Sequence, residues 1–157
     1  MTDRQPRTRE QRRVDTLAKL SAPAADVWVA TATADAGGNA SSYLVPLSLA
    51  WLDERVVLAT EADSVTARNI ASHGRARLGL GPTRDVVMID AELEHVYSLD
   101  EVPADLARRY AMQADWDPRA SGGQMRFLVL RPLRIQAWRE VNELPGRTLM
   151  RDGAWIT

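Results

Sequence analysis

Cysteine is absent from this 157-residue chain. Its absence excludes disulfide bonds, thiolate metal sites and a cysteine nucleophile. Histidine is scarce as well, because only His73 and His95 are present and they lie far apart in the sequence. Without an H-x-x-x-H pair, the two imidazoles do not have the spacing of a zinc or iron site. We therefore expect no metal centre.

Several catalytic motifs are also missing. The nine glycines form neither G-x-G-x-x-G nor a P-loop, so a Rossmann or nucleotide-hydrolase assignment has no motif to support it. A hydrolase triad could be drawn from Ser48, His73 and Asp85, but no nucleophile-elbow sequence surrounds the serine. Neither class of enzyme is expected.

Long apolar runs are lacking too, and the N-terminus is polar and arginine-rich, without the apolar segment of a signal peptide. The 21 acidic and 20 basic side chains leave a formal net charge of -1. No global field therefore attracts nucleic acid or an anionic membrane. We expect a single cytoplasmic domain over residues 1–157, with an N-terminal arm and helix at 1–20 and a C-terminal tail at 139–157.

The clearest pattern lies between Tyr43 and Gly81. Alternating apolar residues, a polar turn and a capped helical segment follow one another there. The sequence predicts a strand ending at Trp51, a turn at Asp53-Glu54, a strand over 55–60, a helix capped by Asp63 or Ser64 and stopped at Gly74, and a strand over 75–81.

The flanking segments add further strands and two helices. The predicted elements are a helix over 9–20, a hairpin of 27–34 and 40–51, a strand over 85–98, a helix after Pro103 capped by Asp100 or Ser98, a loop over 116–123, and last strands over 125–130 and 133–138 with Pro132 at a bulge or edge. Strands at this spacing, with only short helices between them, favour a closed antiparallel barrel over a parallel α/β fold.

The first helix carries two expectations of its own. Val14, Leu17 and Ala18 recur at helical spacing, so they should form the packed face. The arginine run beside them should be a solvated face rather than a nucleic-acid surface. Its members are Arg4, Arg7, Arg9, Arg12 and Arg13.

The junction between Thr60 and Asn69 has chemistry suited to an anion. A strand end followed by a capped helix start exposes backbone N–H groups and the positive end of a helix dipole. Hydroxyls of Thr60, Ser64 and Thr66 add donors, and Arg68 adds a cation. A plain surface helix with a solvated Arg68 gives the same local pattern, so both interpretations stay open here.

The wider motif is more specific. T-x-x-x-S-x-x-A-R-N follows a V-P hairpin and precedes G-R-A-R-L-x-L. From about Val27 to Ala137 this series resembles the pyridoxamine 5'-phosphate oxidase-like family, also called flavin/deazaflavin oxidoreductases. The resemblance implies a mainly β fold with a few short helices: a Greek-key antiparallel split β-barrel of the FMN-binding type. It also implies FMN, or the deazaflavin F420, bound at a homodimer interface.

The resemblance assigns cofactor contacts residue by residue. The phosphate maps onto Thr60, Ser64 and the two positions that follow, which are commonly basic in the family but are Val65 and Thr66 here. The flavin ring maps onto the V-P hairpin. The full set implied is Val45, Pro46, Leu47, Ser48, Thr60, Ser64, Thr66, Arg68, Asn69, Asp85, Trp138 and Arg147.

The tail limits the substrate. Trp138 and Arg147 match a C-terminal W…R segment that approaches the cofactor, although a plain core tryptophan and a turn arginine give the same pattern. The R-x-H pair that true oxidases use for the vitamin substrate is missing, since Thr148 and Leu149 follow Arg147.

The resemblance therefore implies a flavin-dependent oxidoreductase of unknown small-molecule substrate, with hydride exchange through N5 of FMN, or alternatively F420, and no assignable catalytic side chain. A non-catalytic flavin, F420 or haem carrier and a degenerate member without cofactor are the alternatives.

Overall fold

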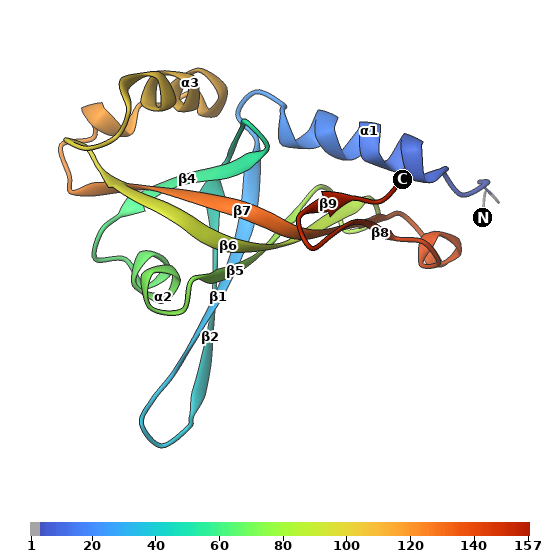
Figure 1. Ribbon diagram of the computed structural model, residues 1–157, viewed down its shortest axis with the longest axis horizontal. Coiled ribbons are helices and arrows are strands. Elements are labelled where there is room, and N and C mark those ends of the chain that lie inside the picture. Colours follow the sequence, from blue (N-terminus) through green and yellow to red (C-terminus); the bar gives the residue numbers. More distant parts are fainter. Residues whose placement is uncertain (1–3) are drawn as a thin grey trace.

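Nine strands form one antiparallel sheet in the computed structural model, which describes residues 4–157 (Figure 1). The hydrogen-bonded order is β2-β1-β5-β6-β7-β4-β3, and β8 and β9 extend it from β7. The strands are β1 Asp26–Ala34, β2 Ala40–Ser48, β3 Ala50–Leu52, β4 Arg55–Glu61, β5 Arg75–Leu80, β6 Val86–Ser98, β7 Met125–Trp138, β8 Thr148–Arg151 and β9 Ala154–Trp155. The helices are α1 Arg9–Leu20, α2 Val65–His73 and α3 Ala104–Ala114, with 3₁₀ turns at Pro118–Ala120 and Val141–Glu143. The mainly β fold is confirmed.

The barrel is split rather than closed. β2 and β3 are the two ends of the strand order, and Leu49 alone joins them along the chain. Leu49 is fully buried, so this linker draws both sheet ends toward the same core. No hydrogen-bonded seam pairs β2 with β3 in the described part of the chain. The closed barrel expected from strand spacing is therefore wrong, whereas the split barrel implied by the family resemblance is confirmed.

Two apolar clusters flank the sheet, because alternate residues of β4 and β7 point to opposite faces of it. Leu58 and Leu128 belong to the larger cluster inside the barrel, while Ala59 and Phe127 belong to a smaller one beneath α3. In the smaller cluster, the fully buried ring of Tyr110 packs edge-on against Phe127. None of the helices in residues 4–157 is both long and apolar enough to cross a membrane.

The central segment folds as its sequence predicts. Ser64 is the N-cap of α2, and Gly74 ends the helix with a left-handed φ of 69°. Asp53 and Glu54 both have positive φ, as the two-residue hairpin turn requires. α3 begins differently, because its N-cap is Pro103, which makes no side-chain cap bond. The expected cap by Asp100 or Ser98 is therefore wrong.

The packed face of α1 differs from the one its apolar spacing predicts. Val14 is 56% exposed, and the buried residues are Arg12, Thr16 and Leu20. The Arg12 guanidinium donates to the carbonyls of Glu143, at 2.9 Å, and Ala137, at 3.5 Å, so its burial is satisfied by hydrogen bonds. The expectation of a wholly solvated arginine run is therefore wrong for Arg12.

The last part of the chain forms more strand than predicted. β7 is a single strand from Met125 to Trp138 rather than two, and Leu133 is the extra residue of a bulge beside Pro132. The bulge at Pro132 is as predicted. The C-terminal tail adds β8 and β9, so the strands ending at Trp138 are not the last.

Candidate functional site

The strand-to-helix junction brings two of the expected hydroxyls together. Thr60 is partly exposed and directly follows the buried run of β4, and its Oγ1 donates to Oγ of Ser64 at 3.3 Å. Ser64 Oγ in turn accepts from the N–H of Ala67 at 3.1 Å. The N–H groups of Val65 and Thr66 lie in the first turn of α2 and have no intrahelical acceptor. The junction therefore presents two hydroxyls and two backbone donors near the positive end of a helix.

Two other polar residues of α2 face inward. Thr66 is 1% exposed and Asn69 is 7% exposed, so neither has a freely accessible side chain in the single chain. Asn69 Nδ2 donates to Thr31 Oγ1 at 3.1 Å, which ties α2 to the middle of β1. Asn69 thus positions the helix rather than offering a free donor to a ligand.

Arg68 points out from the first turns of α2 and is exposed. Its guanidinium forms no ion pair within residues 4–157, whereas Arg7, Arg77, Arg109 and Arg131 each pair with a carboxylate. Its charge therefore remains available to an anion at the helix start.

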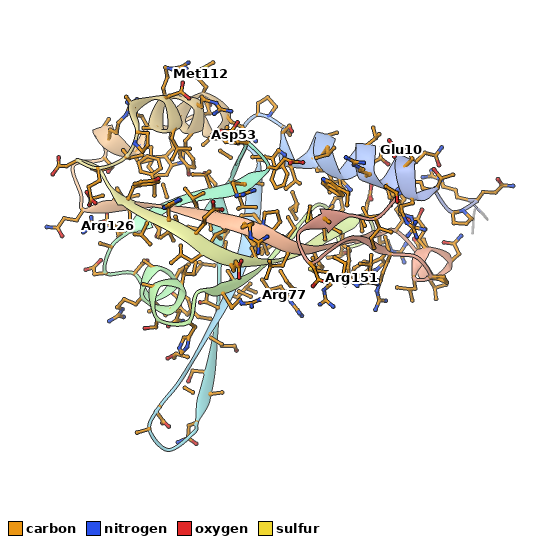
Figure 2. All side chains as sticks on the ribbon, in the orientation of Figure 1. Glu10, Asp53, Arg77, Met112, Arg126 and Arg151 are labelled. Atoms are coloured by element: carbon orange, nitrogen blue, oxygen red, sulfur yellow. The ribbon has the colours of Figure 1, made fainter. Side chains whose placement is uncertain are left out.

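Arg126 is a second cation at this end and was not predicted from the sequence. It lies directly across from Thr60 in the pairing of β4 with β7, and directly opposed residues of an antiparallel pair share a face. Figure 2 shows Arg126 at the start of β7, at the α2 end of the sheet. Its side chain donates a hydrogen bond to the carbonyl of Met125 at 3.2 Å, and no carboxylate within residues 4–157 forms an ion pair with it. The only sequence signal was a basic residue following the Gly122-Gly123 loop.

The hairpin residues expected beside a flavin ring lie at the end of β2. Val45 and Leu47 are half-buried against the barrel core, while Pro46 is exposed on the opposite face. The carbonyl of Ser48 accepts from the Tyr110 hydroxyl at 3.5 Å, which fixes the end of this strand. This end of β2 is thus packed against the core on one face of the strand and exposed on the other.

The remaining predicted residues lie at the other end of β7. Trp138 pairs with Val86, and the Arg147 guanidinium lies over the Trp138 ring at 5.5 Å from its centroid. Arg126 and Trp138 are twelve residue steps apart along β7, which corresponds to roughly 40 Å of extended chain. The structure therefore brings Trp138 together with Arg147, but not with Thr60 and Ser64 of the same chain.

Asp85 belongs to a half-buried ionic cluster at this second end. Its carboxylate pairs with Lys19 at 2.8 Å, Arg139 at 3.2 Å and Arg7 at 3.3 Å. Burial alone would raise the pKa of Asp85, but these three cations together lower it. The charge of Asp85 is thus neutralised by cations of the same chain, so its carboxylate has a structural role.

Arg7 and Glu143 form the core of the same cluster. The Arg7 guanidinium donates to both carboxylate oxygens of Glu143, at 2.7 and 3.0 Å, and its backbone N–H donates at 2.9 Å. Glu143 is only 2% exposed. These hydrogen bonds lower the pKa of Glu143 from its usual 4.5 to about 2, and they raise the pKa of Arg7. Arg7 is therefore a structural residue, contrary to the solvated face expected for the arginine run.

No group of three or more His, Asp or Glu side chains within residues 4–157 is arranged to hold a metal ion. The polar groups at the α2 end are instead hydroxyls, backbone N–H groups and guanidinium groups. This donor set fits a phosphate.

The architecture defines a split β-barrel. Neither a protein-family model nor a curated protein matches the sequence, so the similarity rests on solved structures. The chain is similar to an F420 reductase, with a TM-score of 0.54, 16% identity, and coverage of 75% of this chain and 93% of that one.

Two further structures have the same fold. A protein from Listeria innocua, named provisionally as a pyridoxamine 5'-phosphate oxidase, has a TM-score of 0.56 and 11% identity, covering 82% of this chain and 97% of that one. A heme-binding protein from Mycobacterium smegmatis has a TM-score of 0.59 and 20% identity, covering 96% of this chain and 60% of that one. The resemblance to the pyridoxamine 5'-phosphate oxidase-like proteins is therefore confirmed at the level of the fold.

Proposed function

We propose that the chain is a flavin-dependent oxidoreductase that holds the cofactor phosphate at the start of α2. The observation that carries the proposal is the junction at Thr60 and Ser64, where two hydroxyls and free helix N–H groups lie near Arg68 and Arg126, two arginines without carboxylate partners in the described chain. The fold supports the proposal, because structures with this architecture include an F420 reductase.

The chain's own residues have a limited task in such a reaction. Thr60, Ser64 and the two arginines would bind and orient the phosphate, and the backbone of residues 45–48 would support the ring and exclude water from it. A flavin held there would supply the redox chemistry, which is hydride exchange through its N5 atom. No side chain of the junction is assigned a proton-transfer role.

The active assembly is proposed to be a homodimer. Trp138 and Arg147 lie roughly 40 Å along β7 from the phosphate junction of their own chain. We infer that they approach a cofactor at that junction from a second copy. A cleft between two subunits reconciles the two groups of predicted residues.

FMN is the preferred cofactor, and F420 is the alternative. Val65 and Thr66 stand where relatives commonly have a basic pair, and Thr66 is buried, so the phosphate charge would fall to Arg68 and Arg126 instead. F420 has a longer acidic tail that could meet these arginines by charge complementarity.

A carrier function is the second candidate, because the same fold occurs in a heme-binding protein. In that case the chain would bind flavin, F420 or haem without turnover. His95, exposed and stacked on Tyr97 at 5.4 Å between ring centroids, is an accessible imidazole that could contact a haem.

The test is a parallel fluorescence titration of the purified apo protein with FMN and F420 at two salt concentrations, with a haem titration followed by absorbance. A reduction assay with each reduced cofactor then separates enzyme from carrier. Tight FMN binding with acceptor reduction supports the proposal. Tighter, salt-sensitive F420 binding would replace FMN by F420. Binding without acceptor reduction would favour the carrier, and no binding would leave a barrel without a cofactor.

A further inference from the structure

The β1–β2 ribbon extends well beyond the barrel. Its register runs unbroken from Asp26 opposite Ser48 to Ala34 opposite Ala40, and Figure 1 shows its far half projecting past α2 into solvent. Every residue from 32 to 44 is exposed. A two-stranded hairpin alone is only marginally stable in water, so the projecting half lacks the packing that usually holds such a ribbon.

The two faces of the ribbon differ in composition. One face continues the barrel interior through Val27, Val29, Val45 and Leu47, and then becomes hydroxyl-rich. The opposite face, here called the outer ribbon face, consists of Trp28, Ala30, Ala32, Ala34, Ala40, Ser42, Leu44 and Pro46. Asp26 and Ser48 end this face at its base; the other residues carry no charge, and all of them except Ser42 are apolar.

The outer ribbon face is uncovered in the described chain. Trp28 is 54% exposed and Leu44 is 59% exposed, so both large apolar side chains are accessible to a partner. The helix nearest the ribbon, α2, binds the other face, since Asn69 bonds Thr31. Contiguous apolar faces of this kind on soluble proteins mark sites of interaction.

We propose that the outer ribbon face binds the same face of a second copy, with the two ribbons antiparallel about a twofold axis. Large residues lie at the base of the face, at Trp28, Leu44 and Pro46, and small ones toward the tip. An antiparallel arrangement sets the base of one ribbon against the tip of the other, so large side chains meet Ala34 and Ala40. A parallel arrangement would press Trp28 on Trp28 and leave a gap at the tips.

The charge pattern agrees with this partner. An apolar face is complementary to another such face, and the charged groups lie at its margins: Asp26 at its base, and Arg77 opposite Ala30 in the β1–β5 pairing. Arg77 is paired with Asp90 at 2.6 Å and is labelled in Figure 2. A ribbon of nine residues is about 30 Å long, so it can form the apolar centre of an interface of about 800 Å² per partner. This inference rests on the proposed homodimer and gives it a specific contact surface.

β2 is also the edge strand of the sheet, so pairing edge to edge is the competing geometry. Pro46 lacks a backbone N–H and interrupts that edge. The two geometries make different predictions for neighbouring residues of β1. Face-to-face pairing buries only every second residue, those of the outer ribbon face, whereas edge-to-edge pairing does not distinguish one residue from the next.

The experiment compares Ala32→Glu with Thr33→Glu by light scattering and sedimentation at micromolar concentration. Both positions are exposed and adjacent in β1, but only Ala32 is on the outer ribbon face. We expect the unchanged protein and Thr33→Glu to be dimers, and Ala32→Glu to be a monomer with a dimer dissociation constant raised at least about 100-fold, because a buried unpaired carboxylate is strongly unfavourable. Equal dissociation of both variants, or of neither, would overturn the proposal. Circular dichroism checks that each variant is folded.

Cysteine cross-linking tests the antiparallel geometry, and the natural absence of cysteine makes single introduced thiols unambiguous. Ala32→Cys lies near the middle of the face and should form an intermolecular disulfide at least about tenfold faster than Ala34→Cys at the tip. Faster linking through Ala34→Cys would contradict the antiparallel geometry. A monomeric protein that still binds FMN would defeat this inference but not the proposed cofactor site, whereas a dimer that binds no cofactor would do the reverse.

Discussion

The two ends of β7 both gather arginines beside polar side chains, yet the chain uses them differently. At the Trp138 end, Arg7 is bonded to Glu143 through both carboxylate oxygens, and Asp85 has three cationic partners. At the Arg126 end, Arg68 and Arg126 have no carboxylate partner in the described residues. The charge of the first end is neutralised within the fold, while that of the second is left for an anion. The environment, not the residue type, separates a structural arginine from a candidate binding arginine.

Removing Arg7 should break the structural end. We expect Arg7→Ala to lower the free energy of unfolding by about 3–5 kcal/mol, because Glu143 would remain buried with its main cationic partner gone. Urea denaturation measures this change. Arg9→Ala is the matched control, since Arg9 is exposed and its one side-chain hydrogen bond within residues 4–157 goes to the Thr157 carbonyl, and it should change stability by no more than about 0.5 kcal/mol. Equal effects of the two substitutions would contradict the comparison.

Acid should weaken the same end. The pKa of Glu143 is about 2 in the folded chain and near 4.5 when unfolded, so its stabilisation is complete above pH 4.5 and is lost as the pH falls toward 2. A difference of this size corresponds to about 3 kcal/mol. Denaturation midpoints measured between pH 6 and pH 2.5 test the prediction. Glu143→Gln should show a shallower decline over this window, and an unchanged slope would mean that another carboxylate is responsible.

The neutral bond that anchors α2 should contribute less than these charges. We expect Asn69→Ala to destabilise the fold by about 1–2 kcal/mol, because Thr31 Oγ1 would lose its partner in a buried position. A double-mutant cycle with Thr31→Val isolates the pair, and its coupling energy should be about 0.5–1.5 kcal/mol. Strictly additive effects would show that the hydrogen bond itself contributes nothing.

Local patterns predicted the fold best where each element is specified by its own residues. The alternation before Trp51, the Asp53-Glu54 turn and the two caps of α2 all depend on neighbours in the sequence. The packed face of α1 was mispredicted because Arg12 bonds carbonyls more than 120 residues away. No helical period can reveal such partners, so the apolar spacing of Val14 was misleading.

The residues of the candidate site were also predicted best where their signal is local in the sequence. Thr60 and Ser64 were found because a strand end and a helix cap are local features. Arg126 was missed because it reaches Thr60 only through the register of β4 against β7. The separation of Trp138 from Ser64 was also hidden, since a motif lists residues without the length of the strand between them. Long-range register is what the sequence alone does not supply.

Removing Arg68 should have the smallest effect on stability, and it tests whether the Arg126 end of β7 binds an anion. Arg68→Ala removes an exposed side chain that has no ion pair in the described chain, so the unfolding free energy of the apo protein should change by less than about 0.5 kcal/mol. FMN binding should weaken by roughly 1.5–3 kcal/mol, the value of a hydrogen bond to a charged group. Arg126→Ala should behave alike, because it lies across from Thr60 on the same face.

Arg151→Ala is the control for the loss of one positive charge, since Arg151 is exposed on β8 (Figure 2). It should leave both stability and FMN affinity unchanged. Raising the salt concentration should weaken binding in the unchanged protein more than in Arg68→Ala, because the variant has one fewer cation facing the phosphate. Lost apo stability with unaltered FMN titration in Arg68→Ala would mean that this arginine is structural, and the distinction between the two ends of β7 would then fail.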